Sequence, residues 1–238
     1  MEEDRTQTSV NVVEEVVVKL NPQSIAARLH GGRLDDTETV ARLVERVENV
    51  IRPAACYRTC YVDGKEDEAV ILEGVRFASR VLRTNLENVW KVFPYVVTIG
   101  EEFDELTRDC PDLLEKYYLD AIGNLSLAKA QTQLGNDLKA RFRIEKISHM
   151  NPGSLNDWPI EQQEPLFSIL GDVLGHIGVK LSPTFLMEPA KSLSGIFFPT
   201  ETPFESCQLC PRRDCPARRA AYDARLVKRY GITPETES

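Results

Sequence analysis

The sequence lacks the short signatures of several common enzyme classes. It contains no GxGxxG, GxxxxGKS/T, HExxH or GxSxG pattern, and these are the patterns that hold nucleotide phosphates, bind catalytic zinc or present a nucleophilic serine. Their absence argues against a nucleotide-fold dehydrogenase, a P-loop enzyme, a zincin and a serine hydrolase. Histidine is scarce as well, with three residues in 238, and no two carboxylates have a spacing that by itself predicts acid–base catalysis. The sequence therefore names no acid, base or nucleophile.

A long hydrophobic run is also missing. No segment approaches the roughly 20 apolar residues that a helix needs to span a bilayer. The N-terminal stretch MEEDRTQTSV is acidic and polar, without the apolar core of a secretory signal. These absences predict a cytoplasmic protein that does not enter a membrane and whose six cysteines stay reduced. Three disulfides, as in a secreted chain, are the weaker alternative.

Charge is unevenly distributed along the chain. The formal net charge is -8, which argues against a general binder of nucleic acid or acidic membranes. Residues 207–230 nevertheless carry seven Lys/Arg and two Asp/Glu, a local +5 that leaves -13 on the remainder. This asymmetry predicts two units, a domain over 1–204 and a basic, cysteine-containing tail with a helix over 205–238. A nucleic-acid contact by the tail alone is disfavoured because the rest of the chain is so acidic.

Hydrophobic periodicity predicts a mixture of strands and helices. Strands are expected over 10–20, 52–64, 68–74 and 94–100, and on both sides of a turn at Glu188-Pro189 within 181–199. Helices are expected over 35–51, 80–92, 101–110, 112–142 and about 160–177. Because strands and helices do not alternate regularly as βαβ units, the pattern predicts an α+β fold with a largely antiparallel sheet.

Three local details accompany these elements. Cys56 and Cys60 are four residues apart, so on one strand they would share a face as small core residues. Asp157 is expected to cap the helix that follows it, with Pro159 in the first turn. Gly178 is expected to end that helix.

Three cysteines stand close together as Cys207-x2-Cys210-x4-Cys215. A CxxC turn lets two thiolates point at one ion, and a third thiolate five residues further can close the same face, one ligand short of a tetrahedral site. An iron–sulfur cluster uses thiolates at similar spacings, so a cluster, zinc and unligated thiols all remain open. The fourth ligand would be an outside group, a histidine, Cys56, Cys60 or Cys110.

The second signal is a loop that reads HMNPGS over 149–154. Gly153 permits unusual backbone angles and Pro152 adds rigidity, which suits a loop whose main-chain groups meet a ligand. On its own this pattern is weak, because ordinary turns use the same residues.

The block 148–198, which begins with this loop, resembles the C-terminal activation domain of cobalamin-dependent methionine synthase. In that family a PG-containing loop precedes a helix and a segment of the type KLTxSxxMxPxxSVSGxxF, matched here by KLSPTFLMEPAKSLSGIFF over 180–198. Weaker similarity in helix order and in VVTIGEEFDEL extends over most of the chain, as in a stand-alone member of the family. The residues in register are Lys180, Leu181, Met187, Pro189, Ser192, Ser194, Gly195 and Phe198.

The resemblance implies a C-shaped α+β fold that binds S-adenosylmethionine beside a corrinoid protein. In that family the domain holds the cobalamin module while an electron reduces inactive cob(II)alamin, and S-adenosylmethionine then supplies a methyl group. The resemblance thus predicts an accessory protein for reductive reactivation of a cobalamin-dependent methyltransferase such as methionine synthase, with cobalamin bound only by the partner. An iron–sulfur cluster at the cysteines would serve as an electron relay, whereas zinc would be structural.

The loop departs from the family pattern R-P-A-P-G-Y, whose arginine and neighbours hold the methionine part of the cofactor. A single imidazole does not reproduce a bidentate guanidinium–carboxylate contact. The alternative hypothesis is therefore a non-catalytic, metal-stabilised interaction module that keeps the fold without binding S-adenosylmethionine. The matching positions here are His149, Met150, Asn151, Pro152, Gly153 and Ser154.

Overall fold

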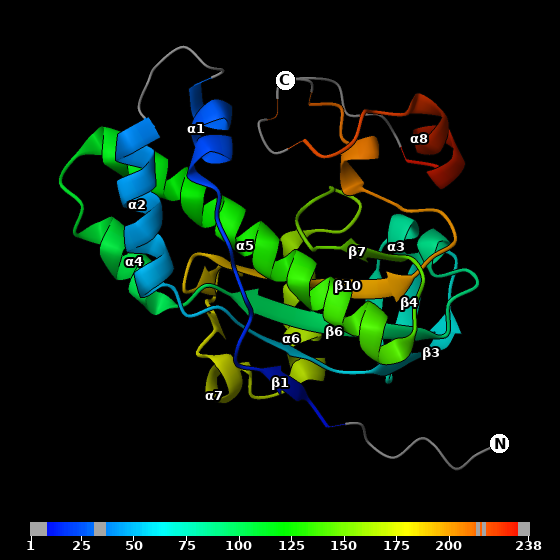
Figure 1. The fold of residues 1–238 in the computed structure, drawn as a ribbon. Coiled ribbons are helices and arrows are strands. Elements are labelled where there is room, and N and C mark those ends of the chain that lie inside the picture. Colours follow the sequence, from blue (N-terminus) through cyan, green and yellow to red (C-terminus); the bar gives the residue numbers. More distant parts are fainter. Residues whose placement is uncertain (1–8, 31–36, 213–214, 216–217, 233–238) are drawn as a thin grey trace.

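The computed structural model describes residues 9–30, 37–212, 215 and 218–232, and Figure 1 shows the fold as a ribbon. Eight of the strands form one antiparallel sheet, and the other two form a separate small hairpin, β8–β9. The strands are β1 (Asn11–Val13), β2 (Ala54–Tyr57), β3 (Cys60–Lys65), β4 (Ala69–Leu72), β5 (Val75–Ala78), β6 (Lys91–Thr98), β7 (Ile147–Met150), β8 (Lys180–Leu181), β9 (Met187–Glu188) and β10 (Ser192–Pro199).

Strand β6 is the centre of the large sheet. One of its edges pairs with β10, which in turn pairs with β7. Its other edge pairs with both β2 and β3, which lie one after the other beside it. The sheet continues from β2 to β1 and from β3 through β4 to β5. Each of these pairs is antiparallel, so the predicted α+β fold with an antiparallel sheet is confirmed.

The helices cover both faces of this sheet (Figure 1). Among the described residues, no helix has the length of apolar sequence that a membrane crossing needs. The helices are α1 (Pro22–His30), α2 (Thr37–Val50), α3 (Arg80–Asn85), α4 (Glu101–Arg108), α5 (Leu113–Phe142), α6 (Gln163–Leu170), α7 (Val173–Ile177) and α8 (Ala224–Tyr230), with short 3-10 turns η1 (Ile160–Gln162) and η2 (Ser206–Gln208).

Helix α5 belongs to two of the three hydrophobic clusters. Its second half packs Ala130, Leu134 and Leu138 against Phe93 and Phe197 on one face of the sheet. Its first half packs instead with α1, α2 and α4, in a separate cluster of helices. The predicted start of this helix is confirmed, because the Asp112 side chain accepts hydrogen bonds from the first-turn amides of α5.

The opposite face of the sheet carries the largest cluster. Trp158 and Leu166, from the region of η1 and α6, pack there with residues of α3 and of the sheet. Leu209 and Val227, from the C-terminal segment, and Phe204 just before it are buried in the same cluster. The C-terminal segment is therefore fixed by apolar packing although its surface is basic. The division into 1–204 and 205–238 stays a prediction.

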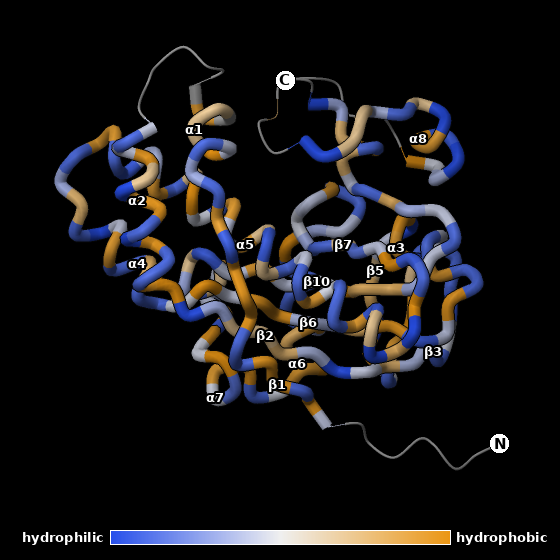
Figure 2. Tube along the Cα trace, in the orientation of Figure 1, coloured by the Kyte–Doolittle hydropathy of each residue, from blue (hydrophilic) through white to orange (hydrophobic). Residues whose placement is uncertain are grey.

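The strand expected over 10–20 is wrong beyond Val13. Only β1 pairs with β2, and the following residues form a linker that runs past α5 to α1 (Figure 1). This linker is partly hydrophobic (Figure 2), and Val16 is buried in the cluster under α5. Val16 is therefore held by burial without strand pairing, whereas Val17 is exposed. Helix α1 at the end of the linker was not predicted.

The single strand expected over 52–64 is two strands that meet different parts of β6. The pairing of β2 with β6 ends at Pro94. Arg58 N donates to Pro94 O at 3.0 Å, but proline has no N–H with which to donate a hydrogen bond back to β2. The expected pairing of β3 with β4 is confirmed. Cys56 and Cys60 are both fully buried in the large cluster, so their expected place in the core is confirmed as well.

The expected helices over 35–51, 101–110 and 112–142 are confirmed as α2, α4 and α5. The helix expected over 80–92 ends at Asn85, because the residues from Lys91 onward extend β6. The helix expected over 160–177 is broken at Gly171, whose φ of 71° separates α6 from α7. Gly178 does end α7 in a left-handed conformation, as predicted.

The expected pair of strands within 181–199 is partly right. Strands β8 and β9 already form a hairpin before Glu188-Pro189. The Glu188–Pro189 bond is cis and separates β9 from β10. The long strand β10 then pairs with β6 and β7, so it belongs to the large sheet.

Candidate functional site

Three strands meet closely where β10 crosses between β6 and β7. Tyr95 of β6 is fully buried, and its hydroxyl lies 2.5 Å from Gln131 Nε2 of α5 and 2.8 Å from Asn151 Nδ2. The same Asn151 amide donates to Ser194 O at 2.6 Å. Gly195 lies against this group, and it has no side chain to displace it. The result is a buried polar network that ties α5 to the sheet.

The serines of the SLSG motif extend this network across β10. Ser194 Oγ bonds to Gln163 Oε1 at 2.9 Å, and Gln163 Nε2 donates to Phe185 O at 2.7 Å. Ser192 Oγ bonds to Thr98 Oγ1 of β6 at 2.9 Å. These two serines are therefore structural in this fold, because their hydroxyls pair with buried groups and do not face solvent.

His149 lies on the α5 side of the sheet, next to this network. Its ring meets that of Phe197 edge-on, with centroids 5.4 Å apart. Among the described residues, its buried Nε2 has no hydrogen-bond partner. Burial, and to a smaller extent the positive charge of Arg219, lowers the pKa of His149 to about 4. At neutral pH the side chain is thus an uncharged imidazole with one unused nitrogen.

This shift makes a testable prediction about stability. Between about pH 6.5 and pH 4 the unfolded chain binds a proton at His149 and the native chain does not, so stability falls as the pH falls through that window, by about 3 kcal/mol at most. We expect His149→Gln to lose less stability than the wild type between pH 7 and pH 4, measured by urea unfolding. The matched control, His176→Gln, alters an exposed histidine and should keep the wild-type loss. Equal losses in the wild type and His149→Gln would contradict the prediction.

The rest of the predicted loop folds largely on itself. Met150 and Asn151 are buried, whereas Gly153 and Ser154 are exposed. Gly153, with φ of 80°, donates its N–H to Trp158 O at 2.8 Å, and Ser154 N donates to Asn151 O at 3.1 Å. The amides of the loop tip are therefore already used within the loop. That this loop binds a cofactor stays a prediction.

A pocket of about 400 Å³ separates the loop tip from the C-terminal segment. Gly153 and Ser154 line one side of it, and Leu209, Cys210 and Pro211 line the other. The fold thus brings together two regions that the sequence analysis singled out separately, the 149–154 loop and the cysteine segment.

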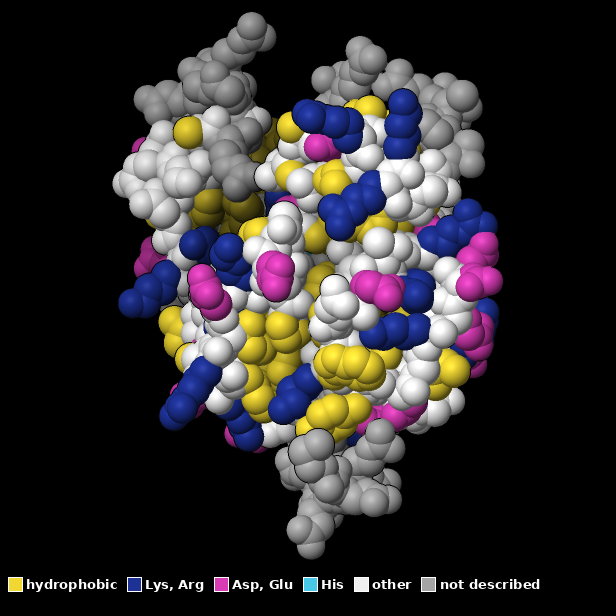
Figure 3. All heavy atoms as spheres, turned by 90° about the vertical axis from the view of Figure 1, so that its right-hand side faces the viewer, with side chains coloured by type: hydrophobic (Ala, Val, Ile, Leu, Met, Phe, Trp, Pro, Cys, Tyr) yellow, Lys and Arg dark blue, Asp and Glu magenta, His cyan; other side chains and the backbone are white. Residues whose placement is uncertain are grey.

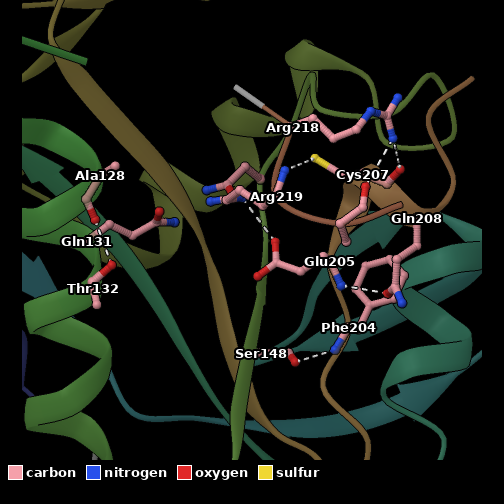
Figure 4. A network of polar contacts seen from close by, with 12 residues as sticks. Ala128, Gln131, Thr132, Ser148, Phe204, Glu205, Cys207, Gln208, Arg218 and Arg219 are labelled. Carbon is pink, nitrogen blue, oxygen red and sulfur yellow. Dashed lines mark hydrogen bonds and ion pairs between the residues drawn. The ribbon is translucent and has the colours of Figure 1, made fainter. Parts of the chain in front are cut away.

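Arg218 forms hydrogen bonds with the segment that contains Cys207 and Cys210. Its Nη1 donates to Cys207 O at 3.0 Å and to Ala220 O at 3.1 Å, and its Nη2 donates to Cys210 O at 3.2 Å. The same nitrogen also donates to Arg212 O. One guanidinium therefore holds four carbonyl groups of the segment together (Figure 4 shows the contact with Cys207).

The three cysteines are partly buried free thiols. Within the part of the chain that the structure describes, no three His, Cys, Asp or Glu side chains lie where they could hold a metal ion. Of the cysteines proposed as a fourth ligand, Cys56 and Cys60 lie in the sheet core, where burial raises each pKa to about 12, and Cys110 lies among the helices. A metal or cluster at Cys207, Cys210 and Cys215 stays a prediction that the observed placement does not support.

The side chains that the C-terminal segment brings to the site were not predicted from the sequence. Arg219 and Glu205 form an ion pair, with Nε and Oε2 3.1 Å apart. They stand opposite Gln131 of α5 (Figure 4). The signal in the sequence was the cluster of basic residues, which predicted a basic tail over 205–238. Lys and Arg side chains do gather at the top of the face in Figure 3, where α8 and the C-terminal segment lie.

Comparison with known proteins gives a match in fold alone. No family model matches the chain, and no curated protein matches it. Among solved structures, the chain is similar to one described as "Crystal Structure of the MetH Reactivation Domain bound to AdoHcy", with a TM-score of 0.51 and 14% identity over 94% of this chain and 86% of that chain. The shared feature is a curled antiparallel sheet with flanking helices, so the fold expected from the sequence resemblance is confirmed.

Proposed function

We propose that this protein is an accessory component of a cobalamin-dependent methyltransferase such as methionine synthase. It supports reductive reactivation of the partner's corrinoid. The observation that carries the proposal is the agreement of two likenesses, one in the sequence of residues 180–198 and one in the fold, to a MetH reactivation domain bound to AdoHcy. The corrinoid belongs to the partner and would be docked beside this chain.

In this role the partner's corrinoid would be the substrate. A low-potential donor would supply it with one electron, and S-adenosylmethionine would supply the methyl group and leave as S-adenosylhomocysteine. The protein itself needs no acid, base or nucleophile for these steps, because binding and orientation are its contribution.

The residues present fit such a methyl donor only in part. The family's loop arginine is absent, and His149 at its position is an uncharged imidazole. A cation lies in the neighbouring C-terminal segment, where Arg219 pairs with Glu205 at 3.1 Å. The Nε2 of His149 is buried and has no hydrogen-bond partner among the described residues. A cofactor site on the α5 side of the loop is therefore compatible with these side chains.

A reconstitution experiment tests the proposed function. The full chain is mixed with a corrinoid methyltransferase in the cob(II)alamin state, S-adenosylmethionine and a chemical reductant. We expect the cob(II)alamin absorbance to be replaced by that of methylcob(III)alamin, and omission of this protein or of the methyl donor should prevent the change. An unchanged spectrum with a partner that binds the protein would contradict the role in reactivation.

The second candidate is an interaction module that keeps the fold without the cofactor. The loss of the loop arginine and the internal pairing of the loop amides favour it. This candidate predicts association with a corrinoid protein but no heat of S-adenosylmethionine binding in calorimetry. Iron and sulfide in protein purified without oxygen would instead support an electron relay at the cysteines.

A further inference from the structure

Cys207 and Cys210 stand at the two ends of one tight turn. Cys210 N donates to Cys207 O at 3.4 Å, at the end of the 3-10 turn η2. A turn closed by such a hydrogen bond keeps its first and last Cα atoms within about 7 Å of each other, and a disulfide joins residues whose Cα atoms are about 4.4 to 6.8 Å apart. The backbone therefore brings the two free cysteines into the range that a disulfide can bridge.

The two residues between the cysteines fix this turn in place. Gln208 Oε1 accepts from Glu205 N at 2.9 Å, and Gln208 O accepts from Asp223 N at 2.8 Å. Leu209 is buried in the largest hydrophobic cluster. Because the turn is already ordered, a bond between the two sulfurs restricts little further chain motion and costs little conformational entropy.

Two arginines extend this support to the cysteines themselves. Arg218 Nη1 donates to Cys207 O at 3.0 Å, and its Nη2 donates to Cys210 O at 3.2 Å. Arg219 N donates to Cys207 Sγ at 3.5 Å (Figure 4). The contacts of the C-terminal segment thus hold the backbone of both cysteines and one of the two sulfurs.

The pair can be reached by a small molecule. Cys210 lines the pocket of about 400 Å³ between the loop tip and the C-terminal segment. Among the described residues, no third His, Cys, Asp or Glu side chain lies with the pair where the three could share a metal ion, and Cys215 is included in that statement. The arrangement is therefore that of two adjacent thiols, one of them open to the pocket.

We propose that Cys207 and Cys210 are a reversible dithiol–disulfide pair that exchanges with small-molecule disulfides. The Cys210 thiolate attacks one sulfur of the small disulfide, which forms a mixed disulfide and releases one thiol. The Cys207 thiolate then attacks the Cys210 sulfur and releases the second thiol. Two electrons pass from the protein to the small disulfide, and the two protons of the cysteines end on the released thiols. Neither a corrinoid nor a methyl donor takes part, so the pair is independent of the proposed function.

Oxidation of the full chain by glutathione disulfide tests the proposal. Trypsin releases residues 192–212 as one peptide that contains Cys207 and Cys210, whereas Cys215 falls in another peptide. After oxidation and alkylation of the remaining thiols, we expect mass spectrometry to show the 192–212 peptide unalkylated and lighter by two hydrogen atoms. Cys215 should be alkylated in the same sample. Treatment with dithiothreitol should restore alkylation of both cysteines in the 192–212 peptide.

Single substitutions separate the roles of the two thiols. Cys207→Ser cannot resolve the mixed disulfide, so we expect glutathione to stay attached to Cys210. Cys210→Ser removes the thiol that lines the pocket, and we expect glutathione to attach to Cys207 more slowly than it attaches to Cys210 in Cys207→Ser. The matched control is Cys215→Ser, which should form the internal disulfide as the wild type does.

Three results would overturn the proposal. Full alkylation of the 192–212 peptide after exposure to glutathione disulfide would show that the pair does not exchange. Stable attachment of glutathione to Cys207 and Cys210 in the wild type, or a bond from either of them to Cys215, would show that the turn does not join the two sulfurs. Iron or zinc that binds these thiols in the purified protein and prevents their oxidation would make them metal ligands instead.

Discussion

Replacing Gly195 with alanine is expected to destabilise the fold by about 3 kcal/mol or more, the upper end of the range for overpacking. A Cβ atom at this position would lie 2.4 Å from Met150 O, 2.5 Å from Asn151 Nδ2 and 2.9 Å from Tyr95 OH. The nearest of these is a backbone atom of β7, so relief requires β7 and β10 to separate. Urea unfolding followed by circular dichroism measures the loss.

A matched glycine distinguishes this clash from a general effect of alanine. A Cβ atom on Gly64 of β3 would meet only the side chain of Ile71, at 3.3 Å, and that side chain can move. We therefore expect Gly64→Ala to cost much less. The Gly195→Ala variant should remain destabilised in a Tyr95→Phe background, because the clash with Met150 O persists. A cost below about 1 kcal/mol would show that β7 shifts easily.

Removal of the Asp157 carboxylate is expected to cost about 2 to 3 kcal/mol, because a half-buried amide and a half-buried hydroxyl lose a charged acceptor. Asp157 accepts from Val81 N at 2.9 Å, from Arg80 N at 3.2 Å and from Ser79 Oγ. It thereby caps α3 from a loop far along the chain. Val81 is fully buried in the largest cluster, so fraying of this helix end disturbs the core.

Two further variants test the prediction for Asp157. Asp157→Asn keeps one acceptor oxygen and should recover part of the stability that Asp157→Ala loses in urea unfolding. Asp67→Ala alters an exposed carboxylate in the turn before β4 and should stay within about 0.5 kcal/mol of the wild type. Equal stability of Asp157→Ala and Asp67→Ala would mean that Ser79, whose Oγ accepts from Leu82 N, caps α3 unaided.

Asp157 also shows where prediction from the sequence stops. Local preference predicted that it caps the helix just after it, but η1 and α6 have no side-chain cap from it, and its partners lie 76 to 78 positions earlier. Elements fixed by local signals were found, such as α5 behind the cap of Asp112. Contacts between distant segments leave no local pattern to read.

In the candidate site, too, the residues of a continuous motif could be predicted and the contacts between distant segments could not. The SLSG serines and the 149–154 loop could be found because they form a continuous motif. Tyr95, which bonds to Asn151, and Gln131, which bonds to Tyr95, lie 56 and 20 positions before Asn151 in the sequence and carry no motif. Arg219 was visible as part of a basic cluster, yet only the packing of the C-terminal segment pairs it with Glu205.

The length of α5 has a mechanical consequence. At 30 residues it spans roughly 45 Å, and it is anchored among the other helices at one end and on the sheet at the other. Gln131 lies within the stretch that packs on the sheet and bonds to Tyr95. One continuous helix therefore joins the helical cluster to the sheet, and its packing at both ends fixes how the two are oriented.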